Sequence, residues 1–159
     1  MPIAAHPRLA SLVLLAIASL ALSACHPGNK EAKLLREKVD ADLKANPNAN
    51  LVVLGDFNHT KDSPSTKVLI GHGKTKLVDT RPAERNGDNA PPEKAWFDPN
   101  NITWTHYYGK EDSYSRIDYI LLSPAMTKFW DKKETYVLAI PNWGVGSDHR
   151  PVTAAFDLP

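Results

Sequence analysis

The chain has 159 residues, with 19 Lys and Arg against 18 Asp and Glu, so its formal net charge is only +1. A near-neutral chain lacks the basic excess that usually accompanies general binding to nucleic acid. Its single cysteine excludes a disulfide within the chain, and its length is enough for one domain with a modest core.

Residues 1–24 have the pattern of a secretory signal peptide: MPIAAHPR, which carries one arginine, precedes the apolar run LASLVLLAIASLALSA. The run covers 24 − 9 + 1 = 16 residues, fewer than the roughly 20 that span a bilayer. It ends in Leu22-Ser23-Ala24-Cys25, which resembles the lipobox of bacterial lipoproteins and makes Cys25 a candidate lipid anchor. An ordinary signal peptide followed by a stray cysteine is the alternative.

This interpretation divides the chain into a signal peptide (1–24), a lipidated cysteine with its linker (25–29) and one domain (30–159). The protein would be secreted across the inner membrane. It would then be held on a membrane surface by Cys25, in the periplasm or at the cell surface, without spanning the bilayer.

Apolar spacing predicts an amphipathic helix over residues 30–46, followed by a strand at 51–54 that is buried on both faces. Ser63-Pro64 is typical of a helix start, and the helix that follows should close at Gly71. A weak strand is predicted at 77–78. Helix, strand and helix in this order indicate an α/β fold.

The rest of the chain reads as a loop followed by strands. Residues 81–101 are rich in Pro, Asn and charge, which predicts a long surface loop and a candidate for substrate contact. Strand-like segments follow at 102–109 and 113–123, with a hairpin-like connection, and further strands are predicted at 135–140 and 151–158.

Polar residues are attached to several of these strands: Asp56 and Asn58, His106, Asp118, and the pair Asp148-His149. Such groups gather at one end of the strands in α/β sheets, where they would form a phosphate and metal site. Each also has a simpler explanation. Asp56 and Asn58 can make local turn bonds, Asp118 can face solvent, residues 147–149 can be a polar loop, and His106 reads as structural.

Three of these stretches occur in the order found in the endonuclease/exonuclease/phosphatase superfamily, which the chain resembles over about residues 31–158. They are GDFN (55–58), RIDYILLS (116–123) and SDHRPV (147–152). The resemblance implies an α/β fold built as a four-layer sandwich. Of that sandwich this chain would supply one half, a mixed sheet with helices on one face.

The resemblance also implies roles for site residues. Asp56 would orient or deprotonate the attacking water, and Asn58 would hydrogen-bond the phosphate or the water. Asp118 would pair with His149, which contacts phosphate, and Asp148 would be a metal-associated carboxylate, with Asp56 as a second metal ligand. Carboxylate oxygens favour Mg²⁺, with Mn²⁺ or Ca²⁺ as substitutes.

The amino-terminal half that carries the family's metal-binding glutamate has no counterpart here. We therefore expect the inner face of the sheet to lack a cover, which favours self-association or a second chain that supplies the missing half. The predicted function is a metal-dependent phosphoester hydrolase, and the alternative is a catalytically inactive remnant or binding module. Nucleic acid, a sugar phosphate and a lipid head group all remain open as the phosphoester substrate.

Overall fold

The computed structural model describes residues 12–17, 28–84, 104–138 and 141–159. Its main sheet has four strands in the order β1-β2-β7-β3, with bounds Leu12–Ile17, Asn50–Asp56, Asp118–Leu122 and Val78–Asp79. The sheet is mixed, because β1 runs parallel to β2 while β2 and β3 are antiparallel to β7. The predicted α/β fold with a mixed sheet is thereby confirmed.

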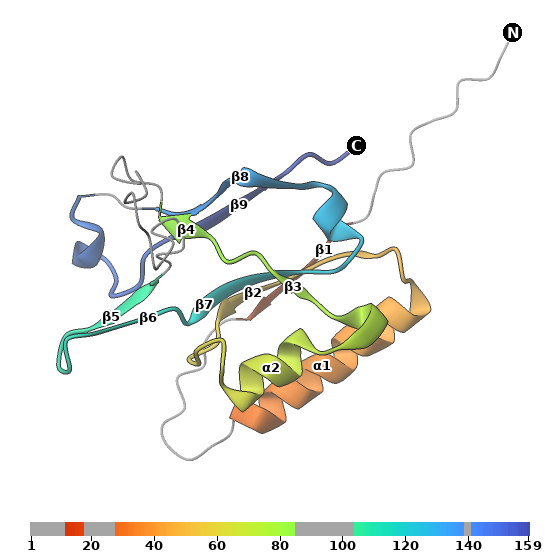
Figure 1. Cartoon of the computed structure of the whole chain (residues 1–159), viewed down its shortest axis with the longest axis horizontal. Helices are drawn as coiled ribbons and strands as arrows, with labels where there is room; N and C mark the ends of the chain where they lie inside the picture. Colours follow the sequence, from red (N-terminus) through yellow and green to blue (C-terminus); the bar gives the residue numbers. More distant parts are fainter. Residues whose placement is uncertain (1–11, 18–27, 85–103, 139–140) are drawn as a thin grey trace, which may run out of the picture.

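The helices α1 (Gly28–Ala45) and α2 (Pro64–Ile70) lie side by side on one face of this sheet (Figure 1). The start and end of α2 are as predicted: the Ser63 side chain accepts a hydrogen bond from the Thr66 N–H, and Gly71 ends the helix at φ 70°. Alternate residues of β2, Leu51 and Val53, face the helices and pack in the core with Val39 of α1.

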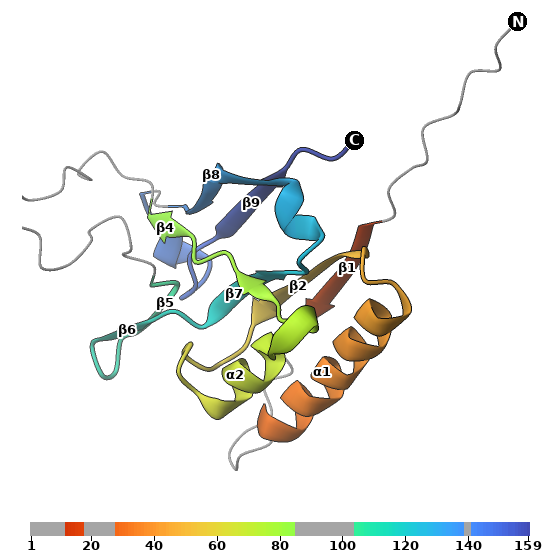
Figure 2. The same ribbon diagram turned by 45° about the vertical axis from the view of Figure 1, so that its right-hand side comes forward.

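The opposite face of the sheet is covered by a second sheet, β4-β8-β9, with bounds Ala83–Glu84, Trp130–Val137 and Val152–Phe156 (Figure 2). Val52 of β2 and Ile120 of β7 pack there, with Val152 and Phe156 against them. The prediction that this inner face lacks a cover is therefore wrong for β2 and β7. The carboxy-terminal strands supply the cover, because β9 returns across the sheet after β8.

A two-stranded hairpin, β5 (His106–Tyr108) with β6 (Ser113–Ser115), extends from the start of β7 (Figure 1). This matches the predicted hairpin-like connection. Short 3-10 helices occur at Gly73–Thr75, Met126–Lys128 and Trp143–Val145. Of the predicted 81–101 loop, Ala83–Glu84 forms β4, and 85–101 lies outside the described residues.

The apolar amino-terminal run includes strand β1, which pairs with β2 from Leu12↔Asn50 to Ile17↔Gly55. A short run of β-branched and aliphatic residues suits a strand as well as the core of a signal peptide, so its pattern alone does not separate the two. Cys25 lies outside the described residues, and signal cleavage and lipidation stay predictions. Within the described part of the chain, no helix is long and apolar enough to cross a membrane.

Candidate functional site

The site lies where β2 ends and β7 begins. In the antiparallel register of these strands, Asp56, the last residue of β2, is directly opposite Asp118, the first residue of β7. The two carboxylates therefore come together because GDFN and RIDY pair across a ladder, although they are 62 residues apart (118 − 56) in the sequence. His149 comes from the loop before β9 and joins them.

The imidazole of His149 is held between the two aspartates. Its Nδ1 lies 2.8 Å from Asp118 Oδ2, and its Nε2 lies 3.9 Å from Asp56 Oδ2. Burial lowers the pKa of His149, but the hydrogen bond with Asp118 and the charges of Asp118, Asp56 and Asp148 outweigh burial. The pKa is therefore raised above its ordinary value of 6.5. The arrangement favours an imidazolium directed at the space beside Asp56.

The GDFN turn keeps Asp56 in place. Asp56 Oδ1 accepts a hydrogen bond of 2.8 Å from the Asn58 N–H, and Asn58 has a left-handed backbone at φ 55°. The local turn bond considered for this pair is thus present, and Asp56 Oδ2 still faces His149. The Asn58 side chain is exposed, and among the described residues it makes no hydrogen bond to the rest of the site.

The RIDY segment also holds the GDFN turn in place. The Tyr119 hydroxyl donates to the His59 carbonyl at 2.9 Å, and its ring stacks on Phe57 with centroids 4.8 Å apart. Burial raises the pKa of Tyr119 to about 12, so this hydroxyl stays protonated as a donor. Arg116 makes two hydrogen bonds to Asp79, of 3.0 and 2.6 Å, which tie β7 to β3.

Asp148 and His106 form the outer part of the site. Asp148 is 70% exposed, and its Oδ2 lies 3.5 Å from His106 Nε2. The rings of His106 and His149 are 4.7 Å apart. His106 was expected to be structural, but the structure brings it into the site through an antiparallel bridge to His149. The sequence already groups His106 with the other polar residues attached to strands, and the long-range pairing is what brings it to His149.

Two groups of side chains could hold a cation. The first is Asp56, Asp118 and His149, and the second is His106, Asp148 and His149. Within each group the donor atoms lie within 4.8 Å of one another. Carboxylates are present in both, so the donor chemistry fits a divalent ion. Each group also contains at least one imidazole, and no trio made of oxygen donors alone is found among the described residues. Mg²⁺ would therefore be held by few carboxylates and by water.

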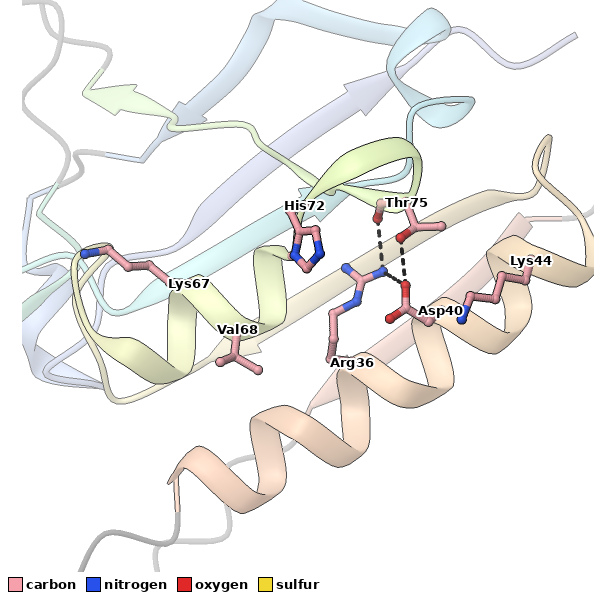
Figure 3. Close-up of a pocket in the computed structure, with 8 residues that line it drawn as sticks. Arg36, Asp40, Lys44, Lys67, Val68, His72 and Thr75 are labelled. Carbon is pink, nitrogen blue, oxygen red and sulfur yellow. Dashed lines mark hydrogen bonds and ion pairs between the residues drawn. The ribbon is translucent and has the colours of Figure 1, made fainter.

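A separate pocket of about 530 Å³ lies between α1 and α2, lined by Arg36, Lys44, Lys67 and His72 among others (Figure 3). Arg36 is buried there and donates to the carbonyls of Leu69, Ile70 and Thr75 and to Asp40. Both terminal nitrogens of this guanidinium are thus hydrogen-bonded, and they tie the end of α2 to α1. The pocket shares no residue with the site at β2 and β7.

A model of the Endonuclease/Exonuclease/phosphatase family matches residues 11–149. The match covers most of the chain, and the chain belongs to this family. It includes β1 and the motifs that carry Asp56, Asp118, Asp148 and His149. No curated protein matches the chain. Membership in this family indicates phosphoester hydrolysis as the class of activity, and the family is generally dependent on divalent metal ions.

Proposed function

We propose that this chain hydrolyses phosphoesters with a divalent metal ion, and that Asp56, Asp118 and His149 are the working side chains. The observation that carries the proposal is the Asp118–His149–Asp56 line, in which the His149 ring lies between the two aspartates. Its Nδ1 is 2.8 Å from Asp118 Oδ2, and its Nε2 is 3.9 Å from Asp56 Oδ2. Three separate segments of the chain build this line. Its two carboxylates and one imidazole supply a base, a hydrogen-bond donor for phosphate and a group that orients the donor.

In the proposed reaction, a water oxygen attacks phosphorus in line with the leaving oxygen, and Asp56 Oδ2 takes the proton of that water. Asp118 holds Nδ1 of His149, so that Nε2–H points at a non-bridging phosphate oxygen and stabilises the developing charge. The bond from phosphorus to the leaving oxygen breaks, and that oxygen takes a proton from solvent. Asn58, exposed at the turn, would donate to the incoming phosphate.

A divalent cation would be held by the carboxylates of Asp56 and Asp148 together with water, and it would neutralise the non-bridging oxygens. Mg²⁺ is the ion that the family resemblance implies, with Mn²⁺ or Ca²⁺ as substitutes. Nucleic acid, a sugar phosphate and a lipid head group remain the three substrate classes.

The proposal is tested by hydrolysis of bis(p-nitrophenyl) phosphate by the purified full chain with Mg²⁺, beside Asp118→Asn. The variant keeps the shape of the side chain but removes the charge that orients His149, and it should lower kcat by about 10²- to 10⁴-fold. Asp42→Asn, on the outer side of α1, is the matched control and should leave kcat unchanged. Equal activity of wild type and Asp118→Asn would refute the proposed role of the pair.

A second candidate function is a binding module that holds phosphate without hydrolysing it. It is favoured by the composition of the two donor groups, whose carboxylates are all aspartates, whereas the family resemblance implies a metal-binding glutamate. A folded chain that shows no hydrolysis, but binds inorganic phosphate in a way that His149→Ala abolishes, would support this candidate over the first.

The amino-terminal run supports two alternative proposals for where the protein resides. If residues 1–24 are a cleaved signal peptide and Cys25 is acylated, the protein is anchored on a membrane surface. If Leu12–Ile17 instead stays in the sheet as β1, the chain remains uncut and has no lipid at Cys25. The two proposals make opposite predictions for amide exchange in a chain that begins at Gly28.

A further inference from the structure

We propose that His106, Asp148 and His149 form a binding site for a transition-metal ion such as Zn²⁺ or Co²⁺. This site lies beside the proposed catalytic carboxylates. The inference shares His149 and Asp148 with the proposed function. Because Nε2 of His149 cannot bind an ion and donate to phosphate at the same time, ion binding and phosphate contact are alternative states of this residue. The inference does not depend on turnover, because it concerns binding of an ion.

The backbone fixes the three residues relative to one another. His106 of β5 forms an antiparallel bridge with His149, and the Tyr107 N–H donates to the Asp148 carbonyl at 3.2 Å. One residue further on, the Arg150 N–H donates to the Thr105 carbonyl at 2.7 Å. These bonds join the loop before β9 to β5 on both sides of the cluster, so its three side chains start from a rigid frame.

The donor atoms already lie near the spacing that a small ion needs. Two ligands of a tetrahedral zinc ion at about 2.1 Å are about 3.4 Å apart. His106 Nε2 and Asp148 Oδ2 are 3.5 Å apart, and the donor atoms of all three residues are within 4.8 Å of one another. A small rotation of the exposed Asp148 side chain would narrow the remaining gap.

Asp118 prepares His149 to act as a ligand. Its contact of 2.8 Å with Nδ1 orients the ring and leaves Nε2 as the nitrogen that can bind an ion. A carboxylate on the far nitrogen of a metal-binding imidazole is the usual second partner at such sites, where it sets the tautomer and raises the basicity of the ligand. Asp56 Oδ2 lies 3.9 Å from the same Nε2, so a further carboxylate borders the site.

The ligand chemistry selects the class of ion. Two imidazoles and one carboxylate suit Zn²⁺ and Co²⁺, whereas Mg²⁺ and Mn²⁺ favour oxygen ligands, and Mg²⁺ retains several waters. Access is open, because the Asp148 side chain is 70% exposed while those of His106 and His149 are 17% and 27% exposed. Solvent ions can therefore reach two partly buried nitrogen ligands over an exposed carboxylate.

The test is titration of the metal-free full chain with Co²⁺, followed by its visible absorption and by calorimetry. Wild type should bind one Co²⁺ with the absorption of a nitrogen-ligated, low-coordinate ion. His106→Ala should lose this signal, and Asp118→Asn should weaken binding by about 10- to 100-fold. His72→Ala changes an exposed histidine outside the cluster and should bind Co²⁺ as wild type does.

Equal Co²⁺ affinity and absorption in wild type and His106→Ala would overturn the inference, as would a wild-type chain that binds no Co²⁺. Circular dichroism of each variant shows whether it is folded. Mg²⁺-supported hydrolysis, measured separately, distinguishes the two proposals: a chain that hydrolyses but does not bind Co²⁺ refutes only the metal site. A chain that binds Co²⁺ through His106 but hydrolyses nothing refutes only the catalytic proposal.

Discussion

Thr105 connects three of the segments that build the site, and its replacement by valine tests how the site is held. Its side chain is fully buried, and its hydroxyl oxygen accepts hydrogen bonds of 3.2 Å from the N–H groups of Ile117 and Asp118. Its own N–H donates to the Ser115 carbonyl at 2.9 Å, and its carbonyl accepts from the Arg150 N–H. Thr105 thereby places Asp118 and the loop that carries His149.

Valine has nearly the shape of threonine but cannot accept a hydrogen bond. A buried donor left without a partner costs about 1–3 kcal/mol. The Ile117 N–H is buried and the Asp118 N–H is half-buried, so Thr105→Val should lower the free energy of unfolding by about 2–4 kcal/mol. Thr105→Ser keeps the hydroxyl and loses one methyl group, which should cost about 1 kcal/mol.

The assay is urea unfolding of wild type and both variants, followed by circular dichroism, with phosphodiester hydrolysis measured on the same samples. Valine should be the more destabilising of the two replacements and should lower kcat as well, because Asp118 loses a bond that fixes its backbone. A Thr105→Val chain as stable as Thr105→Ser would refute this account of the Thr105 hydroxyl.

Three further predictions concern the ion pair between Arg116 and Asp79, the pKa of His149, and strand β1. Asp79→Asn leaves the guanidinium of Arg116 nearly buried without its anion and should cost about 3 kcal/mol in urea unfolding, whereas a loss below about 1 kcal/mol would contradict the importance of the pair. With chelator present, wild type should have a higher free energy of unfolding than His149→Gln below about pH 6.5, and this difference should fall as pH rises through the raised pKa of His149. A difference that stays constant from about pH 5.5 to 9 would argue against the raised pKa. A chain that begins at Gly28 should show faster amide exchange in residues 51–55 than the full chain if β1 belongs to the sheet, and unchanged exchange would favour the signal-peptide proposal.

Much of the fold could be predicted because its signals are local. Ser63, Pro64 and Gly71 mark α2 through capping chemistry, and the aliphatic run at 51–54 indicates a strand with two buried faces. The three motifs indicated that Asp56, Asp118 and His149 belong to one site. GDFN and RIDYILLS form the β2–β7 ladder that brings Asp56 and Asp118 together, and His149 joins them from the loop before β9.

What could not be predicted depends on pairings between distant segments. The return of β9 across the inner face of the sheet follows from tertiary packing of Val152 and Phe156, which alternation in a short strand does not specify. His106 is attached to a strand like the other polar residues, but its sequence neighbours do not specify the bridge that brings it to His149. The run at 12–17 is apolar enough for either a signal peptide or a strand, so its composition alone does not predict strand β1.

The central claim is that the Asp118–His149–Asp56 line performs metal-dependent phosphoester hydrolysis. The most direct measurement is hydrolysis of bis(p-nitrophenyl) phosphate by the full chain, with divalent metal and with chelator, for wild type, Asp56→Asn and His149→Gln. The account predicts activity in wild type that the chelator abolishes and that each substitution lowers by at least about 10²-fold. Activity that survives in either variant, or a folded wild-type chain without activity, would contradict it.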